Sequence, residues 1–250
     1  MRRVILALVL GLALAAPAAA WRPLAEAGEA EAQARLGFLY EKGRGVARDL
    51  GEAVRWYRAG ALQGHATAQY SLGRLHELGH GVARDAAAAL AWYRKAAQQG
   101  HAKARYKLGL AYAGGLGVGR DYRQAVGWLG RALDQGYGAA GRVLENLGAA
   151  GRTAHERGDR ALAARLLSAL AEGGRAGDWG AEALLGALHE GGEGVPRALV
   201  RAQAWYARAA ARGDRAAAAA RDRIAHALTP EELRAAQALA RQWSGAGAAE

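Results

Sequence analysis

The hydrophobic pattern of this chain repeats every 36 residues. Apolar and small residues recur at the three- and four-residue spacing of an amphipathic helix, and paired glycines follow each such stretch. The stretch from Leu36 to Gly64 returns twice with no change in spacing. A period of this size predicts helical hairpins that stack and bury their apolar faces against one another. The recurring positions are Leu-Gly (36–37, 72–73, 108–109), Gly-x-Gly-Val (43–46, 79–82, 115–118), Trp56, Trp92 and Trp128, and Gly64, Gly100 and Gly136.

Each unit predicts two helices joined by a glycine loop. In the first unit, residues 30–41 form the first helix, and Gly37 in its interior is expected to allow a close approach of a neighbouring backbone. Gly43 and Gly45 are expected to end that helix. Asp49 is the predicted N-cap of the second helix, and Glu52 would complete a capping box. The inner stripe of the second helix is predicted to consist of Ala53, Trp56, Tyr57 and Ala61.

The same pattern divides the chain into five units and a cap. We expect units at about 29–64, 65–100, 101–136, 137–174 and 175–213, with capping helices over 214–245. The fourth unit lacks the loop glycines and the tryptophan, and it is read as a degenerate helical pair. The fifth restores the pattern but carries Ala198 in place of the capping aspartate and Pro196 in its loop. In the cap, residues 215–228 predict one helix, and Thr229 with Glu232 predicts a capping box before a last helix that ends near residue 243.

Residues 1–20 resemble a secretory signal peptide. Arg2 and Arg3 precede an apolar run, Pro17 interrupts it, and three alanines supply a small-residue cleavage site before Trp21. The alternative is an uncleaved membrane anchor, but the apolar run before Pro17 is short for a span of about 20 residues. We therefore expect a periplasmic or secreted protein that occupies residues 21–245.

The composition limits the kinds of partner and the kinds of site that this chain could have. The formal charge is +11, of which Arg2 and Arg3 contribute two, so the rest of the chain carries +9. Basicity of this size is consistent with nucleic acid, anionic lipid or an acidic partner, but the arginines are spread along the chain without a long run of like charge. There is no cysteine, which excludes disulfides, thiolate metal sites and a cysteine nucleophile.

The repeat resembles the Sel-one-like repeat, a subgroup of the tetratricopeptide superfamily. The matching pattern is A-x-A-x-x-x-L-G-x-x-Y-x-x-G-x-G-V-x-x-D-x-x-x-A-x-x-W-Y-x-x-A-x-x-x-G, which residues 30–64 fit at almost every position. The resemblance implies an all-α, right-handed α-solenoid of about five helix-turn-helix repeats plus C-terminal capping helices. It also implies that the first helices line a concave face that binds proteins or peptides, and that the protein is an adaptor or scaffold. A cysteine-rich branch of the family is linked to β-lactams, and this cysteine-free chain does not resemble it.

Three patterns were weighed as catalytic, metal or ligand sites. His76-Glu77-Leu78-Gly79-His80 matches the H-E-x-x-H of zinc proteases, but Gly79 is the repeat glycine that ends the helix, and no third ligand can be named. His65 and His101 each precede a first helix, which favours capping or packing between units over a ligand pair. Periodicity places the row of tryptophans in the core rather than in a stacking site for bases or sugars. We expect no catalytic residue, no metal and no cofactor.

The outward face of the first helices is the candidate binding surface. Counting from Ala30 as position one, positions two, five, nine and twelve share one face of the helix. The alternative is that Tyr70 and Tyr106 simply pack between units. The outward residues are Glu31, Ala34, Phe38 and Glu41, then Thr67, Tyr70, Arg74 and Glu77, then Lys103, Tyr106, Leu110 and Ala113. Aromatic and arginine side chains dominate binding energy at protein interfaces, so the predicted contact residues are Phe38, Tyr70, Arg74, Lys103 and Tyr106.

The sequence therefore predicts a non-catalytic adaptor of the bacterial cell envelope that binds a protein or peptide on its concave face. The alternatives are an envelope binder of anionic glycan or lipid, motivated by the +9 charge, and a metal-dependent hydrolase at His76 and His80. We expect a monomer with no nucleic-acid partner and with possible peripheral contact to the envelope.

Overall fold

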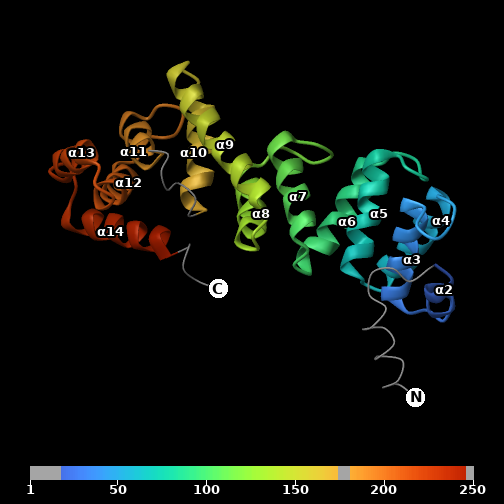
Figure 1. Cartoon of the computed structure of the whole chain (residues 1–250). Helices are drawn as coiled ribbons and strands as arrows, with labels where there is room; N and C mark the ends of the chain where they lie inside the picture. The colour runs from blue at the N-terminus through green and yellow to red at the C-terminus, as the bar shows by residue number, and fades with distance from the viewer. Residues whose placement is uncertain (1–17, 174–180, 246–250) are drawn as a thin grey trace. The chain divides into compact units, whose positions relative to one another are not determined.

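The polypeptide is built from α-helices joined by short loops. The computed structural model describes residues 18–173 and 181–245 (Figure 1). No strand occurs within these two ranges, and the predicted all-α helical-repeat fold is confirmed. No helix in the same ranges combines the length and the apolar character that crossing a bilayer requires. Most of the predicted leader (1–17), the start of the predicted fifth unit (174–180) and residues 246–250 lie outside the described part of the chain.

The chain forms two compact units. Unit 1 comprises the described residues up to 111 together with 116–119. Helix α3 packs against α4, α5 against α6, and α4 against α5, while α2 packs on the outer side of α3. Their facing residues form one buried cluster that includes Trp21, Leu36, Tyr57 and Leu72. The helices are α2 (Ala18–Glu26), α3 (Ala30–Lys42), α4 (Leu50–Leu62), α5 (Ala66–Leu78), α6 (Ala86–Gln98) and most of α7 (Ala102–Gly114).

Unit 2 comprises residues 112–115 and the chain from Arg120 onward. The degenerate fourth repeat does form a helical pair, as predicted, although its first helix is 19 residues long and the second 13. The capping helices α13 and α14 both pack on α12. The helices are α8 (Tyr122–Asp134), α9 (Gly138–Glu156), α10 (Arg160–Glu172), α11 (Ala181–Gly191), α12 (Leu199–Ala211), α13 (Arg215–Ala225) and α14 (Pro230–Gly245).

The predicted aspartate caps are present. The side chains of Asp49, Asp85 and Asp121 each accept a hydrogen bond from the backbone N–H three residues later. The capping box predicted for Asp49 and Glu52 is incomplete, because the Asp49 N–H already donates to the carbonyl of Tyr40. The box at Thr229 does close, with the Glu232 carboxylate accepting from both the backbone N–H and the hydroxyl of Thr229.

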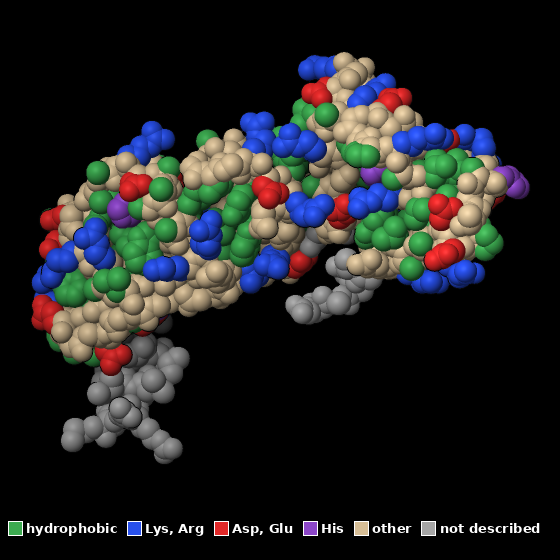
Figure 2. Space-filling view, turned by 180° about the vertical axis from the view of Figure 1, so that it is seen from behind, with side chains coloured by type: hydrophobic (Ala, Val, Ile, Leu, Met, Phe, Trp, Pro, Cys, Tyr) green, Lys and Arg blue, Asp and Glu red, His purple; other side chains and the backbone are tan. Residues whose placement is uncertain are grey.

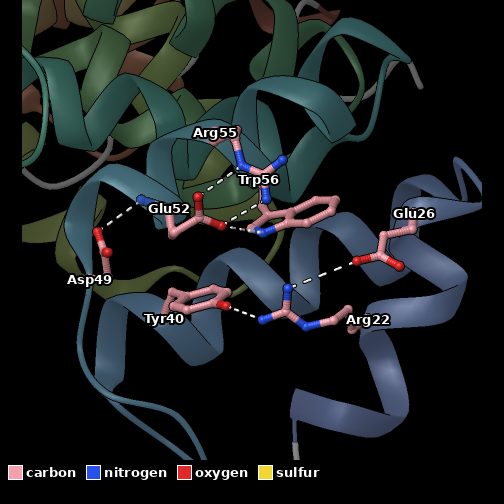
Figure 3. Close-up of polar contacts among 7 residues, drawn as sticks. All are labelled: Arg22, Glu26, Tyr40, Asp49, Glu52, Arg55 and Trp56. Carbon is pink, nitrogen blue, oxygen red and sulfur yellow. Dashed lines mark hydrogen bonds and ion pairs between the residues drawn. The ribbon is translucent and has the colours of Figure 1, made fainter.

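The Glu52 carboxylate has a different role from the predicted one. It accepts hydrogen bonds from Arg55 at 2.8 and 3.0 Å and from Trp56 Nε1 at 3.0 Å (Figure 3). The same figure shows how the N-terminal helix α2 is tied to the first repeat, since Arg22 bonds both Glu26 and the Tyr40 hydroxyl. The polar side chains around Trp56 therefore fix its indole and leave the cap to Asp49 alone.

The repeat tryptophans are buried to different degrees. Trp56 and Trp205 are 5% and 1% exposed, which confirms the predicted core role for these two. Trp92 and Trp128 are only half-buried, so the prediction holds in part for them. All four indoles lie beneath a cation, at 4.2–5.2 Å from the ring centroid, which is the range of a cation–π contact. The cations are Arg55, Lys95, Arg131 and Arg208.

In three repeats, the glycine inside the first helix faces a tyrosine ring of the second helix. A Cβ added at Gly37 would lie 2.9 Å from the ring of Tyr57, and one at Gly186 would lie 2.6 Å from that of Tyr206. The predicted close approach is confirmed, but at Gly37 the neighbour is a side chain of the second helix rather than a backbone. The third repeat has Leu129 in place of this tyrosine.

Candidate functional site

A hollow of about 680 Å³ opens on the first-helix face of unit 1, and we call it the first-helix hollow. Helices α3, α5 and the start of α7 supply most of its wall, and Tyr57 of α4 supplies the rest. Four of the five predicted contact residues line it, namely Phe38, Tyr70, Arg74 and Lys103. The fifth, Tyr106, is half-buried on α7 and is not part of the wall.

Phe38 is the most accessible apolar group of the hollow. It is 39% exposed. Lys42 and Arg44 lie over its ring at 6.0 and 5.6 Å from the centroid. This arrangement joins an open aromatic face to two cations, so a ligand with an apolar group beside an acid would match it.

Glu41 forms the floor of the hollow. Its side chain is 6% exposed, and it receives Lys42 Nζ at 2.6 Å, the Tyr57 hydroxyl at 3.1 Å and the guanidinium of Arg74. Burial on its own would raise the pKa of Glu41, but the hydrogen bond from Lys42, the positive charges of Arg74 and Lys42 and the Tyr57 hydroxyl together hold that pKa below its usual value. Burial, followed by the nearby Glu41 charge, raises the pKa of the Tyr57 hydroxyl, which stays protonated.

Two of the predicted outward positions are wrong. Ala34 and Glu41 are both buried, because the first helix is covered by the next repeat along that edge as well as by its own second helix. As a result, the exposed face of this first helix is narrower than the four outward positions predicted from the sequence. Arg74 is on the hollow as predicted, but its charge is already balanced by Glu41.

Tyr70 has both of the roles that the sequence left open. Its ring stacks on the imidazole of His101 at 4.6 Å and lies 5.7 Å from the ring of Tyr93, so it packs between repeats. It is also half-buried and lines the hollow. Burial, and secondarily the charge of Lys103, lowers the pKa of His101, so its imidazole is neutral at pH 7.

The histidines at the repeat joints are helix caps. The Nδ1 atoms of His65 and His101 accept hydrogen bonds from the backbone N–H groups of Ala68 and Ala104, at 3.2 and 3.3 Å. The capping role that the sequence favoured is confirmed. His65 also contacts Glu31 through Nε2 at 2.7 Å, which links the first two repeats.

Lys103 is the basic side chain of the hollow that is accessible to a ligand. It is exposed and forms no ion pair with any residue that the structure describes. Lys42 and Arg74 share the single negative charge of Glu41, so the wall carries a net positive charge. An acidic group would therefore be attracted to this hollow.

A carboxylate cluster recurs in three repeats, and sequence reasoning missed it. In each of these repeats, the carboxylate of a glutamate at the end of the first helix accepts two kinds of hydrogen bond. One comes from the hydroxyl of the tyrosine 16 residues later, and the other comes from a basic side chain of the next repeat. The signal was the fixed spacing of glutamate and tyrosine, which fails in the third repeat at Ala113 and Leu129. The clusters are Glu41 with Tyr57 and Arg74, Glu77 with Tyr93 and Lys107, and Glu190 with Tyr206 and Arg223.

The H-E-x-x-H segment does not have the geometry of a zinc site. Gly79 ends α5 in the left-handed conformation, at φ 69°, and His80 lies in the loop beyond it. The imidazoles of His76 and His80 therefore do not share a helical turn. Among the described residues, no cluster of three or more His, Cys, Asp or Glu side chains is placed to hold a metal ion.

Comparison with known proteins identifies the repeat. The family model described as Sel1 repeat matches residues 30–65, 66–101, 102–137 and 179–214, which together exceed half of the chain. It leaves out most of the fourth unit, in line with the degenerate repeat predicted there. A search of curated proteins finds no match.

Two solved structures are similar. A protective antigen present in uropathogenic Escherichia coli strains, described as displaying an SLR fold, is 28% identical with a TM-score of 0.49. The match covers 90% of this chain and 55% of that one, so this chain spans about half the length of the antigen. A Sel1 repeat protein from Oxalobacter formigenes is 29% identical with a TM-score of 0.46, over 89% of this chain and 86% of that one.

Proposed function

This chain belongs to the Sel1 repeat family, and we propose that it is an exported scaffold that holds a protein or peptide partner on its concave, first-helix face. Sel1 repeat proteins are generally protein-interaction scaffolds and are typically non-catalytic. The proposal locates the contact at the first-helix hollow of unit 1 and assigns no chemistry to it.

The observation that carries the proposal is the composition of the hollow. The exposed Phe38 of α3 and Lys103 of α7, which forms no ion pair within residues 18–173 and 181–245, both line one hollow of about 680 Å³. A single exposed aromatic residue needs no explanation, but this one shares its hollow with Tyr70 and Arg74, the residue types that are enriched in interface hot spots. The partner that fits is an extended or helical peptide with Asp or Glu next to an apolar residue, since the hollow is net positive.

A peptide library displayed on phage tests the proposal directly. The full chain is immobilised, and peptides are selected on it and on the double variant Phe38→Ala/Lys103→Gln. We expect the full chain to enrich acidic peptides that contain an aliphatic or aromatic residue, and we expect the double variant to lose them. Arg74 and Tyr70 are left unchanged, because both also hold the repeats together.

The matched control is Leu62→Ala/Arg58→Gln. Both residues are exposed on α4, outside the hollow, and Leu62 is 71% exposed. This variant removes the same kinds of group and should retain the selected peptides. Equal enrichment on all three proteins, or no enrichment on any, would refute the proposed contact.

Export is the second part of the proposal, and the support for it is the charged, apolar and small-residue order of residues 1–20. Cleavage before Trp21 would leave its indole, which is 7% exposed and has Arg35 at 5.1 Å, at the start of the mature chain. N-terminal sequencing of protein recovered from a periplasmic fraction is the measurement. A mature chain that starts at Trp21 supports export, and a chain that starts at Met1 in the cytoplasmic fraction contradicts it.

A further inference from the structure

Unit 2 contains a second hollow, which the family match and the proposed function do not assign. Its volume is about 390 Å³, and its wall is formed by α8, α10, α11 and the residues around the start of α12. Basic side chains are spread widely over the face shown in Figure 2, so the overall charge does not single it out. The local composition does, because four arginines line it: Arg120, Arg123, Arg165 and Arg201. We call it the arginine hollow.

Three of these arginines have no carboxylate partner in the part of the chain that the structure describes. The two acidic residues of the wall are already engaged, since Asp121 caps α8 and Glu172 binds Arg123 at 2.7 Å. Within the described residues of the chain, no ion pair is formed by the other three, Arg120, Arg165 and Arg201. The guanidinium of Arg165 lies 5.7 Å from the centroid of the Tyr122 ring, which positions it without neutralising it.

A buried imidazole in the same wall lacks one hydrogen-bond partner. His189 is 5% exposed, and its Nδ1 atom has no hydrogen-bond partner among the described residues. Its other interaction is a hydrogen bond with the backbone of Pro196. Buried polar atoms are almost always satisfied, whereas the wall of the arginine hollow has a buried polar atom that lacks a protein partner among these residues. Burial lowers the pKa of His189 and keeps the imidazole neutral at pH 7, so Nδ1 can accept a bond from a hydroxyl or a protonated oxyanion.

The start of α12 departs from every other repeat of the chain. Asp49, Asp85, Asp121 and Asp159 cap the second helices of the first four repeats, but Ala198 stands at this position in the fifth and makes no cap bond. The residues on either side, Pro196 and Arg201, line the arginine hollow. The substitution removes a negative charge from the edge of the hollow and leaves the first N–H groups of a 13-residue helix without a side-chain acceptor. Helix N-termini of this kind attract anions.

From these observations we propose that the arginine hollow binds an oxyanion of the phosphate or sulfate class. Unpaired guanidinium groups supply charge and paired N–H donors. The uncapped N-terminus of α12 would add backbone donors. The proposal is independent of the peptide contact in unit 1, and either can fail without the other.

Isothermal titration of the full chain with inorganic phosphate, at fixed ionic strength maintained with chloride, is the primary test. A second arm measures co-sedimentation with phosphatidylcholine vesicles prepared with and without phosphatidic acid. Saturable binding in either arm is expected, and the arm that responds identifies the source as a free oxyanion or a lipid headgroup.

The decisive variant restores the missing aspartate. Ala198 has φ −150° and ψ 88°, close to the values of −142° and 101° at Asp121, so Ala198→Asp fits the existing backbone. It should weaken phosphate or vesicle binding by at least about tenfold while raising the thermal midpoint through a new cap. Loss of binding in a protein that is more stable cannot be attributed to unfolding.

Two further variants complete the design. Arg165→Gln/Arg201→Gln should also abolish saturable binding. Arg234→Gln changes one exposed arginine of α14 outside the hollow and should leave binding unchanged. Absence of binding in both arms, or binding that Ala198→Asp and the double arginine variant leave intact, would overturn the proposal.

Discussion

The two compact units use the same repeat for different charge arrangements. In unit 1, Glu41 and Glu77 lie between a tyrosine of their own repeat and a cation of the next, so most cations near the first helices are already paired. In unit 2, three guanidinium groups of the arginine hollow have no ion-pair partner among the described residues, and the aspartate expected at 198 is missing. Unit 2 also has one such cluster, in which Glu190 accepts hydrogen bonds from Tyr206 and Arg223. The difference between the two hollows is therefore local, and it depends on whether the repeat places a carboxylate beside each cation.

The largest expected effect on stability is the loss of a buried tryptophan, and two tryptophans at the same repeat position can be compared. Trp205 in unit 2 is 1% exposed and stacks on Trp243 at 4.0 Å, whereas Trp92 in unit 1 is half-buried. Trp205→Ala should lower the free energy of unfolding by roughly 3–5 kcal/mol, as for large core truncations, and Trp92→Ala by clearly less. Urea unfolding followed by far-UV circular dichroism measures both. Equal losses would mean that burial in the two units does not differ as described.

A smaller effect is expected at the carboxylate cluster of unit 1. Glu41→Gln keeps the shape of the side chain but removes the charge that Arg74 and Lys42 share, and it should cost roughly 2 kcal/mol of unfolding free energy. Glu52→Gln is the control, because Glu52 is more exposed and surface ion pairs contribute about 0–1 kcal/mol. Chemical unfolding at pH 7 gives both numbers, and a cost at Glu52 as large as at Glu41 would argue against a structural role for the cluster.

The same cluster predicts a dependence of stability on pH. The folded-state pKa of Glu41 lies below its ordinary value of 4.5, so its contribution is complete above that pH and is lost as the pH falls through the folded pKa. The thermal midpoint of the full chain should therefore fall below pH 4.5, and that of Glu41→Gln should fall less over the same range. Parallel curves for the two proteins would contradict the depressed pKa.

Glycine substitutions should separate tight from open helix positions. A Cβ at Gly186 would lie 2.6 Å from the Tyr206 ring, so Gly186→Ala should destabilise the protein by roughly 1–2 kcal/mol despite the better helix propensity of alanine. Gly127 lies within α8 with no heavy atom within 4 Å of its added Cβ, so Gly127→Ala should stabilise by roughly 0.5–1 kcal/mol. We expect the two substitutions to shift the thermal midpoint in opposite directions. An increase for both variants would show that the Tyr206 ring can move away from the added methyl group.

A further effect of about 1 kcal/mol is expected at the helix caps. Asp85→Ala removes the hydrogen bond to the Ala88 N–H at 2.9 Å and should cost about 1 kcal/mol. The reverse change at Ala198 should gain a similar amount. A calorimetric scan of the two variants measures both, and a cost at 198 instead of a gain would show that the start of α12 cannot accept a cap.

The repeat fold was predictable because most of its helices have a local signal, whereas α2 (Ala18–Glu26) lies outside the repeat pattern and was not predicted. The 36-residue period, the paired glycines and the aspartate caps each depend on residues close in sequence, and they located the helices of the repeats and of the cap. The site was predictable only in part. Phe38, Tyr70, Arg74 and Lys103 were correctly expected to share one face, since all four line the first-helix hollow. The pairing of Arg74 with Glu41 could not be expected from local spacing, because it joins side chains 33 residues apart. The role of Glu52 was mistaken because the Asp49 N–H donates to Tyr40, a contact across the loop that local spacing does not specify.

The most direct test of the peptide contact is site-specific photo-crosslinking in unit 1. A photoreactive phenylalanine analogue is placed at Phe38 in the first-helix hollow, or at Leu62, which is more exposed but lies outside it. Each protein is irradiated with a selected acidic peptide. We predict a covalent adduct at position 38 and none at position 62. Adducts of equal yield at both positions, or an adduct at position 62 alone, would contradict a partner held by the first-helix hollow.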